Sequence, residues 1–336
     1  MDLGDDLSTR VDALMDGLVA DLKRLTAIPS VAFPGFPPEP VREAHDLLVD
    51  LLRGAGVERV ERLDLPDTAP VVVAEVPPPA PGAPTVLLYG HYDVQPPGDE
   101  ALWFSPPFEP TPVEGGLRAR GIADDKANII VHLGVLRAFA GRPPVGLKIV
   151  LEGQEEYGSA FDDYPPTDPD RFACDAMVIA DMGNLRPGSP TLTTGLQDPR
   201  EARDLLVTHL ESLRPFGIPL TVTPGDTGPG YEPATDGPAY RAARTALREG
   251  WGSEPAFVAS GGSIPLVNGL AEAVPGAEVL LFGAQDGMCN LHAPNERVLF
   301  SELRSAVIAE AAFLREYAKT YGDSATHADS AGARHE

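Results

Sequence analysis

The chain contains few cysteines and no long apolar segment. Cysteine occurs only at Cys174 and Cys289, which are far apart and form no Cys-x-x-Cys pair. Such sparse cysteine excludes a disulfide framework and argues against a thiolate zinc site. No stretch approaches the roughly 18 apolar residues needed to cross a bilayer. The acidic segment 1–6 is unlike a signal peptide, so the sequence favours a cytoplasmic protein.

Basic residues are also scarce. The chain of 336 residues has 26 Lys and Arg against 50 Asp and Glu, a formal net charge of −24 at pH 7. A surface this negative repels phosphate backbones and anionic lipids, which argues against nucleic-acid and membrane partners. The sequence also lacks a Gly-x-Ser-x-Gly string, a P-loop and a strand followed by Gly-x-Gly-x-x-Gly. Serine hydrolases of the elbow type and nucleotide-binding enzymes are therefore disfavoured.

The remaining composition is typical of a folded protein, with 43% hydrophobic and 23% charged residues. Apolar residues at helical spacing predict helices over 8–27, 40–53, 126–139, 200–213, 240–248 and 301–317. Compact apolar runs predict strands over 57–63, 71–76, 86–89, 147–151, 176–180 and 278–282, and an alternating pattern predicts one over 218–223. Continuous apolar strands alternating with helices indicate an α/β fold, with a sheet covered on both faces.

Side chains that can bind a metal follow several of these strands. In chain order they are His91, Asp93, Asp124, Glu155, Glu156, Asp181 and His292. Because ligands of open α/β sheets bind at the carboxyl ends of the strands, we expect these side chains to converge there. Histidine nitrogen combined with carboxylate oxygen suits zinc, manganese or cobalt. A carboxylate shared between two ions would fit a two-metal hydrolase.

Each of these residues also has an ordinary structural explanation. A single histidine at a strand end is often only hydrogen-bonded, and Glu155 with Glu156 could be solvated. Asp124 and Asp125 could cap the helix that follows them. His132, within a predicted helix, is expected to be structural. The recurrence of metal-binding side chains at one edge of the sheet is what favours a site.

Five strings of the sequence resemble, in the same order, the motifs of the M20 metallopeptidases. They are GHYDVQP at 90–96, RGIADDK at 120–126, EGQEEYGS at 152–159, GGSIP at 261–265 and NLHAPNE at 290–296. The resemblance covers residues 8–196 and roughly 235–318. M20 enzymes carry two co-catalytic zinc ions and include dipeptidases, carnosinase-like enzymes, carboxypeptidases and deacylases. The string at 261–265 resembles the dipeptidase branch most.

The resemblance implies a three-layer α/β/α catalytic domain with a mostly parallel, mixed central sheet. It also implies two divalent metal ions, with zinc expected and manganese or cobalt as alternatives. Asp124 would bridge both ions, and the peptide bond after it would be cis. His91 and Asp181 would complete one ion, while Glu156 and His292 would complete the other.

Further roles are implied by the same resemblance. Glu155 would be the general base, taking a proton from the attacking water and returning it to the leaving amine. Asp93 would orient His91 and fix its tautomer. Gly262 and Ser263 would contact the carboxylate of the substrate.

The resemblance breaks after the strand expected over 190–196. Family members insert there a lid and dimerisation domain, which supplies a His to the partner's site and an Arg for the substrate carboxylate. Residues 197–234 of this chain resemble only a remnant of it, with one helix, one strand and a Gly/Pro linker. The expected division is therefore a catalytic domain of 1–196 and 235–322, this remnant, and a disordered tail of 323–336. A monomer is favoured over the dimer of the parent family.

Three hypotheses for function remain open. The first is a two-zinc peptidase that hydrolyses dipeptides or small peptides. The second is an amidohydrolase acting on N-acyl amino acids, since the same metals and base would serve any amide. The third is a metal-binding remnant with little catalysis, because the loss of an oxyanion-stabilising donor typically costs about 10²–10³ in turnover.

Overall fold

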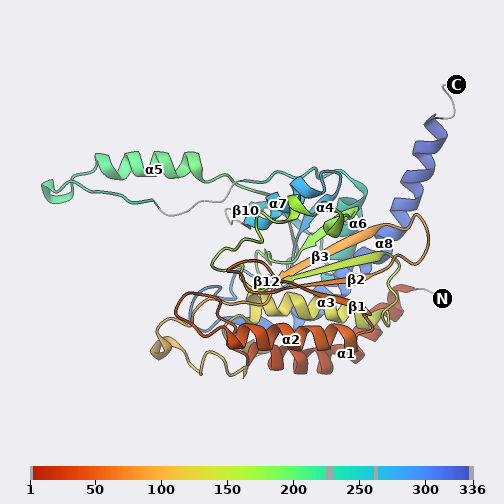
Figure 1. The fold of residues 1–336 in the computed structure, drawn as a ribbon, viewed down its shortest axis with the longest axis horizontal. Helices are drawn as coiled ribbons and strands as arrows, with labels where there is room; N and C mark the ends of the chain where they lie inside the picture. The colour runs from red at the N-terminus through yellow and green to blue at the C-terminus, as the bar shows by residue number, and fades with distance from the viewer. Residues whose placement is uncertain (1–2, 225–229, 261–263, 333–336) are drawn as a thin grey trace.

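The computed structural model describes residues 3–224, 230–260 and 264–332. Over these residues a central eight-stranded sheet runs in the order β1-β2-β6-β3-β7-β11-β9-β10 (Figure 1). Its strands are β1 (Arg59–Leu63), β2 (Val71–Val76), β3 (Thr85–His91), β6 (Gly146–Glu152), β7 (Ala176–Ile179), β9 (Thr191–Leu196), β10 (Ala256–Ser260) and β11 (Glu278–Leu281). The four central strands β6, β3, β7 and β11 are parallel to one another. The pairs β1–β2, β2–β6 and β11–β9 are antiparallel.

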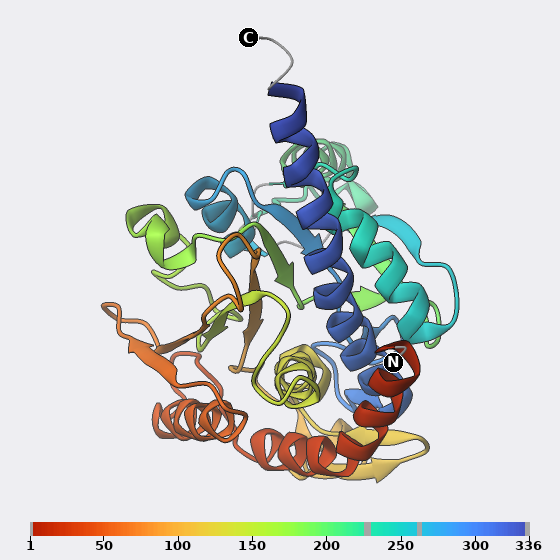
Figure 2. The ribbon, with the colours of Figure 1, turned by 90° about the vertical axis from the view of Figure 1, so that its right-hand side faces the viewer.

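Helices cover both faces of this sheet. One face carries α1 (Leu3–Thr26), α2 (Glu39–Gly54), α3 (Ala127–Ala138), α6 (Pro238–Trp251) and α8 (Phe300–Gly332). The other face carries α4 (Pro169–Phe172) and α7 (Pro265–Ala273). Figure 1 shows α1 to α3 below the sheet with α4 and α7 above it, and Figure 2 shows α6 alongside α8. The predicted three-layer α/β/α fold is confirmed.

Alternation along the strands explains the two hydrophobic cores. In β3, Val86 and Leu88 face the core beneath α3, while Leu87 and Tyr89 face the core beneath α7. Successive side chains of a strand point to opposite faces, so a strand covered on both sides must be apolar throughout. The continuous apolar run that the sequence displays is therefore the direct result of burial on both faces.

Two smaller sheets flank the carboxyl ends of the central strands. One pairs β8 (Gly183–Asn184) with β12 (Gln285–Asp286), and the other orders β13 (Arg297–Leu299), β5 (Gly116–Arg118) and β4 (Thr111–Val113). Short 3-10 turns occupy η1 (Glu100–Leu102), η3 (Pro165–Thr167) and η4 (Pro215–Gly217), and a tight turn, η2 (Ile122–Lys126), leads into α3. These short elements were not predicted, because they carry too few residues to show a period.

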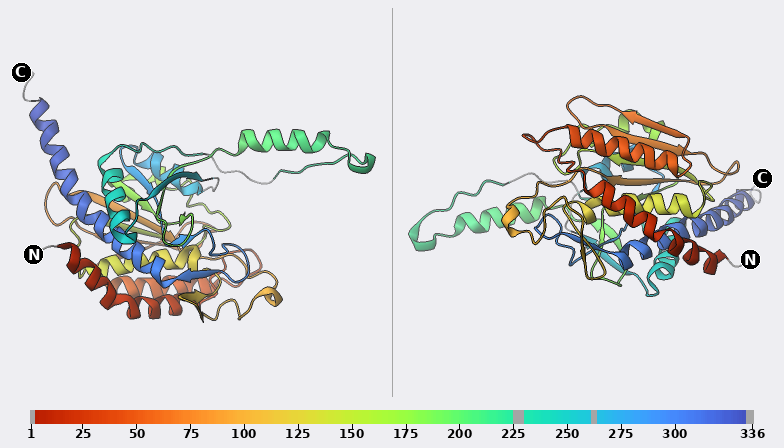
Figure 3. Two further views of the ribbon diagram at one scale, coloured as in Figure 1. Left: turned by 180° about the vertical axis from the view of Figure 1, so that it is seen from behind. Right: turned by 90° about the horizontal axis from the view of Figure 1, so that it is seen from below.

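The segment 197–224 departs in one place from its predicted structure. Helix α5 (Arg200–Ser212) forms as expected, but residues 218–223 form no strand. A strand needs a neighbour for its backbone groups, and this segment extends away from the body of the protein (Figures 1 and 3). No residue of α5 is buried. We call residues 197–224 the arm.

The C-terminal helix is also longer than predicted. Helix α8 continues to Gly332, where a disordered tail was expected from 323 onward, and its end projects beyond the body (Figure 1). Only three of residues 323–332 are alanine, and the others are weaker helix formers such as aspartate, serine, threonine and glycine, so local propensity does not predict this extension. Among the described residues, no helix has both the length and the apolar composition that a membrane span requires.

A buried ion pair joins the central sheet to two helices. His132 of α3 places Nδ1 2.8 Å from Glu310 Oε1 of α8, and Nε2 3.2 Å from the main-chain oxygen of Tyr89 in β3. The structural role expected for His132 is consistent with these contacts. Burial alone would lower the pKa of His132, but Glu310 outweighs this and raises it above its ordinary value.

This pair predicts a pH-dependent stability. Because the folded pKa of His132 is raised, the contribution is complete below the unfolded pKa of about 6.5 and is lost as pH rises through the folded value. Glu310→Gln is therefore expected to lower the free energy of unfolding by about 2 kcal/mol at pH 6 and by less at pH 9. Urea unfolding of both proteins at the two pH values, with a chelator present, measures this. An equal loss at both values would contradict the prediction.

Candidate metal centre

The central strands deliver the predicted ligands to one edge of the sheet. His91 is the last residue of β3 and lies beside Glu152, the last residue of the parallel strand β6. The loop after β6 then carries Glu155 and Glu156, and Asp181 follows β7 by two residues. Parallel strands end at the same edge, so their polar extensions are brought together although they are far apart in the sequence.

Two further predicted ligands reach this edge from loops. Asp124 lies in the turn η2, and its peptide bond to Asp125 is cis, as the resemblance implied. His292 lies in the loop between β12 and β13 with a positive φ of 56°. The structure groups His91, Asp124 and Asp181 on one side, and Asp124, Glu156 and His292 on the other, with ligand atoms of each group within 4.8 Å.

Asp124 belongs to both groups through its two oxygens. His91 Nε2 lies 3.1 Å from Asp124 Oδ1, and His292 Nε2 lies 2.8 Å from Asp124 Oδ2. On the outer sides, Asp181 Oδ2 lies 3.9 Å from His91 Nε2, and Glu156 Oε2 lies 3.2 Å from His292 Nε2. One carboxylate therefore lies between two His–carboxylate pairs.

These donors fit a pair of divalent ions. Metal–ligand bonds of about 2.1 Å in a tetrahedral site place the donor atoms about 3.4 Å apart, close to the separations of 2.8 to 3.9 Å found here. Each group supplies one imidazole and one unshared carboxylate, with Asp124 common to both. The set contains no thiolate, which matches the ligands used by catalytic two-metal sites.

The electrostatics of the cluster point the same way. Hydrogen bonds with Asp124 and Glu156 raise the pKa of His292 to about 10. Burial would lower the pKa of His91, but its contacts with Asp124 and Asp93 raise it well above the ordinary value. Burial, reinforced by Asp124, raises the pKa of Asp181 to about 8. The cluster therefore attracts positive charge, either as protons or as metal cations that displace them.

Glu155 is half-buried next to this cluster, among charged groups that include Asp181 and His91. Burial raises its pKa well above the ordinary value, Asp181 and Asp93 add to the rise, and His91 opposes it. A carboxyl group with a raised pKa is a better proton acceptor and donor near neutral pH than an exposed one. The geometry thus sets Glu155 apart from Glu156, which faces His292 and Gln95.

Asp93 has a broader role in the structure than the one expected. Its main-chain oxygen lies 3.2 Å and its Oδ1 3.4 Å from His91 Nδ1. The same carboxylate also accepts hydrogen bonds from the main-chain N–H of Glu155 at 2.9 Å and of Glu156 at 3.1 Å. Asp93 therefore holds the ring of one predicted ligand and the backbone of the loop that carries two other site residues.

Several residues around the site were not predicted. Asp125 accepts a hydrogen bond from the main-chain N–H of His91 at 3.0 Å and another from Asn128 Nδ2 at 2.5 Å. Gln95 Nε2 donates to Glu156 Oε2 at 2.7 Å, and Gln285 Nε2 donates to Asp181 Oδ1 at 3.3 Å. Gln95 could have been predicted as a site residue because it belongs to the string 90–96. Gln285 belongs to none of the five strings, so the sequence gives no reason to expect it at the site.

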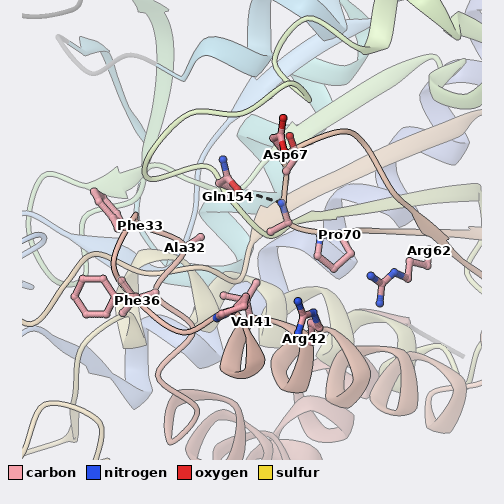
Figure 4. Close-up of a pocket in the computed structure, with 13 residues that line it drawn as sticks. Ala32, Phe33, Phe36, Val41, Arg42, Arg62, Asp67, Pro70 and Gln154 are labelled. Atoms are coloured by element: carbon pink, nitrogen blue, oxygen red, sulfur yellow. Dashed lines mark hydrogen bonds between the residues drawn. The ribbon is translucent and has the colours of Figure 1, made fainter.

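A separate cavity of about 400 Å³ lies beside the loop 153–159 (Figure 4). Its lining includes Phe33, Phe36, Arg42, Arg62 and Gln154. Gln154 Oε1 accepts a hydrogen bond from the main-chain N–H of Ala69 at 3.1 Å, drawn in Figure 4, and its Nε2 donates to the Gly158 oxygen at 2.9 Å. Over the described residues, none of the predicted metal ligands lines this cavity. The predicted substrate contacts Gly262 and Ser263 lie outside the described residues.

Known proteins match this chain both in sequence and in fold. It is 39% identical over 154 residues to a cysteinylglycine-S-conjugate dipeptidase of Corynebacterium striatum, covering 45% of this chain and 33% of that protein. It is 34% identical over 203 residues to a Beta-Ala-His dipeptidase of Rattus norvegicus, covering 55% and 41%. The chain thus spans about a third to two-fifths of the length of these relatives.

The fold comparison reaches further along the chain. A solved structure of the dipeptidase Dug1p from Saccharomyces cerevisiae matches with a TM-score of 0.79 at 18% identity, covering 94% of this chain and 98% of that one. At this identity the match establishes the fold. The sequence profile of the peptidase family M20/M25/M40 matches residues 87–316, which include every predicted metal ligand. This chain belongs to the peptidase family M20/M25/M40.

Proposed function

We propose that this protein hydrolyses the peptide bond of dipeptides or other small peptides, with two divalent metal ions as cofactors. The observation that carries the proposal is the position of Asp124. Its two oxygens face two separate His–carboxylate pairs, 3.1 Å from His91 and 2.8 Å from His292. Membership of a peptidase family and dipeptidases among the relatives support the choice of substrate.

The ligands are assigned to the two ions as follows. His91 and Asp181 would hold one ion, Glu156 and His292 the other, and Asp124 both; zinc suits this donor set, and manganese or cobalt would also suit it. When bound, the two ions lower the pKa of a water and polarise the carbonyl of the substrate. Asp93 keeps His91 and the backbone of the loop 155–156 in position.

Glu155 is the proposed general base and general acid. Its carboxylate accepts a proton from the attacking water and then donates that proton to the nitrogen of the leaving amine. Burial supports this role, because it raises the pKa of Glu155 well above the ordinary value and so makes the carboxylate more basic. Asp93 contributes by fixing the main-chain N–H of Glu155 at 2.9 Å.

We further propose that residues 1–196 and 235–322 form the catalytic domain and that 197–234 are the remnant of a lid and dimerisation domain. The arm supports this division because its apolar side chains, among them Leu205 and Phe216, are exposed. Leu196 and Tyr231 exchange two main-chain N–H···O hydrogen bonds of 2.7 and 2.8 Å, which join the chain on either side of the arm. With most of the dimerisation surface missing, a monomer is the proposed state.

Removal of the arm is expected to leave the body intact. The variant joins Asp198 to Gly230 through two glycines. This removes α5, none of whose residues is buried, and keeps the Leu196–Tyr231 pairing. A shorter loop also lowers the entropic cost of closure. The melting temperature should therefore stay within about 3 °C of the parent or rise, as calorimetry would measure. A fall of about 10 °C would show that the arm packs against the body or a second copy.

The decisive test is hydrolysis of a substrate panel by the zinc-loaded protein. The panel contains dipeptides, including Cys-Gly and β-Ala-His, together with N-acetyl amino acids, and a chelated sample is the control. Cleavage of dipeptides that the chelator abolishes supports the proposal. Cleavage of only the acyl compounds would favour the amidohydrolase alternative. Two bound ions without turnover on any compound would favour a metal-binding remnant.

A further inference from the structure

Glu296 is a fully buried carboxylate beneath the turn that carries Asp124. Its Oε2 accepts hydrogen bonds from Arg120 Nη1 at 2.8 Å and from the main-chain N–H of Gly121 at 2.8 Å. Its Oε1 accepts from the main-chain N–H of Ala123 at 2.9 Å and of Asp124 at 3.1 Å. Each oxygen thus faces two donors, an arrangement that requires the deprotonated carboxylate.

These contacts join two loops that are far apart in the sequence. Glu296 follows His292 by four residues, and its carboxylate binds the segment 120–124. The main-chain oxygen of Glu296 also accepts a hydrogen bond from the N–H of Ala119 at 3.1 Å, and β13 then pairs with β5. The loop that supplies His292 is therefore attached, side chain and main chain, to the turn that supplies Asp124.

Arg120 completes the arrangement from the other side. Its side chain is buried, and the guanidinium lies 5.2 Å from the centre of the Trp103 ring. Its charge offsets that of Glu296, so the carboxylate is held in an apolar setting without an unpaired charge.

We propose that Glu296 is a positioning residue of the metal centre, which fixes Asp124 and His292 relative to each other so that both can bind the same ion. This inference rests on the proposed two-metal site and deepens it. Three main-chain donors from one short turn cannot shift independently while a single carboxylate holds them. Groups that orient metal ligands typically change metal affinity by about 10–100-fold when they are replaced.

Glutamine at this position is a sharp test because it keeps the size of the side chain. Its amide nitrogen would replace one carboxylate oxygen and would face two donors instead of accepting from them. Either the pair from Ala123 and Asp124 or the pair from Arg120 and Gly121 would lose its acceptor. The turn must then move, and with it Asp124.

A matched control is available in Glu302, another buried carboxylate. It accepts hydrogen bonds from Asn184 Nδ2, Gly188 N and Trp251 Nε1, at 2.8 to 2.9 Å. None of these partners is a predicted metal ligand. Glu302→Gln therefore disrupts a buried hydrogen-bond network of similar size without touching the turn of Asp124.

The experiment measures zinc affinity by competition with a chromophoric chelator, and melting temperature with and without zinc. Glu296→Gln is expected to weaken zinc binding at least tenfold and to reduce the rise in melting temperature that zinc produces. Glu302→Gln should lower the melting temperature of the zinc-free protein but leave zinc affinity within about twofold. Equal zinc affinities for the parent and Glu296→Gln would overturn the proposal, because a purely structural role predicts that result.

Two further variants keep the test informative if Glu296→Gln does not fold. Glu296→Asp retains an acceptor carboxylate with a shorter reach and should recover part of the affinity. Arg120→Lys keeps a positive charge beside Glu296 and leaves the three main-chain contacts of its carboxylate, so zinc affinity should fall less than in Glu296→Gln. A larger fall in zinc affinity for Arg120→Lys than for Glu296→Gln would contradict positioning through the main chain. Zinc binding without peptide hydrolysis in the parent would refute the proposed function but not this inference.

Discussion

Replacing Glu155 by glutamine is expected to abolish dipeptide hydrolysis while the protein still binds two metal ions. The amide cannot accept a proton from water or return it to the leaving amine, and general acid–base catalysis is typically worth about 10²–10⁴ in rate. The side chain keeps its size, and the main-chain N–H that Asp93 holds is unchanged. Turnover of the preferred dipeptide and metal content by mass spectrometry provide the two measurements.

The control for this prediction is a glutamate of the same chemistry at an exposed position. Glu114 is exposed and outside the site, so Glu114→Gln should retain the activity of the parent. Substantial activity in Glu155→Gln would remove Glu155 from the role of general base. Loss of metal in this variant would show that Glu155 supports the ions instead.

Replacing Asp124 by asparagine is expected to have the second large effect, because it alters both ion sites at once. In the structure Oδ1 faces His91 at 3.1 Å and Oδ2 faces His292 at 2.8 Å. Asparagine retains one ligating oxygen and loses the negative charge that two cations would share. Fewer than one zinc ion per chain should remain after dialysis, and hydrolysis should be lost with it.

An exposed aspartate again provides the comparison. Asp163→Asn changes the net charge equally, but its side chain lies at the surface, so it should retain two ions. The zinc content of His292→Ala should lie between those of Asp124→Asn and Asp163→Asn, since this change removes a predicted ligand from one group only. Two tightly bound ions in Asp124→Asn would contradict the assignment of Asp124 as the shared ligand.

Much of the fold could be predicted from the local arrangement of apolar residues. The strands over 71–76 and 147–151 show as short continuous apolar runs because both of their faces are buried, and the helix over 126–139 shows apolar residues at helical spacing. The prediction failed over 218–223, where alternation suggested a strand, because no strand among the described residues pairs with this segment. Pairing depends on tertiary contacts, which local alternation does not encode.

The candidate site could be predicted to a similar depth. Residue types and strand ends indicated which side chains converge, and the structure brings all five predicted ligands together. The contacts that support them were missed. From the sequence, Asp125 was expected only as a possible helix cap. In the structure its carboxylate accepts a hydrogen bond from the main-chain N–H of His91. A hydrogen bond between residues 34 positions apart leaves no periodic signal.

The residue types and local patterns of the chain therefore indicate an α/β sheet, histidine and carboxylate side chains at its edge that can bind metal, and a glutamate beside them. How these groups are held depends on contacts between distant parts of the chain. The tertiary structure placed the two oxygens of Asp124 toward different histidines and set Glu296, 172 residues from Asp124 along the chain, beneath the same turn. Hydrogen-bond donors and acceptors of distant loops become partners only when the chain packs, and this packing leaves no local pattern. The apolar pattern of a helix or strand, in contrast, lies within the residues of that element.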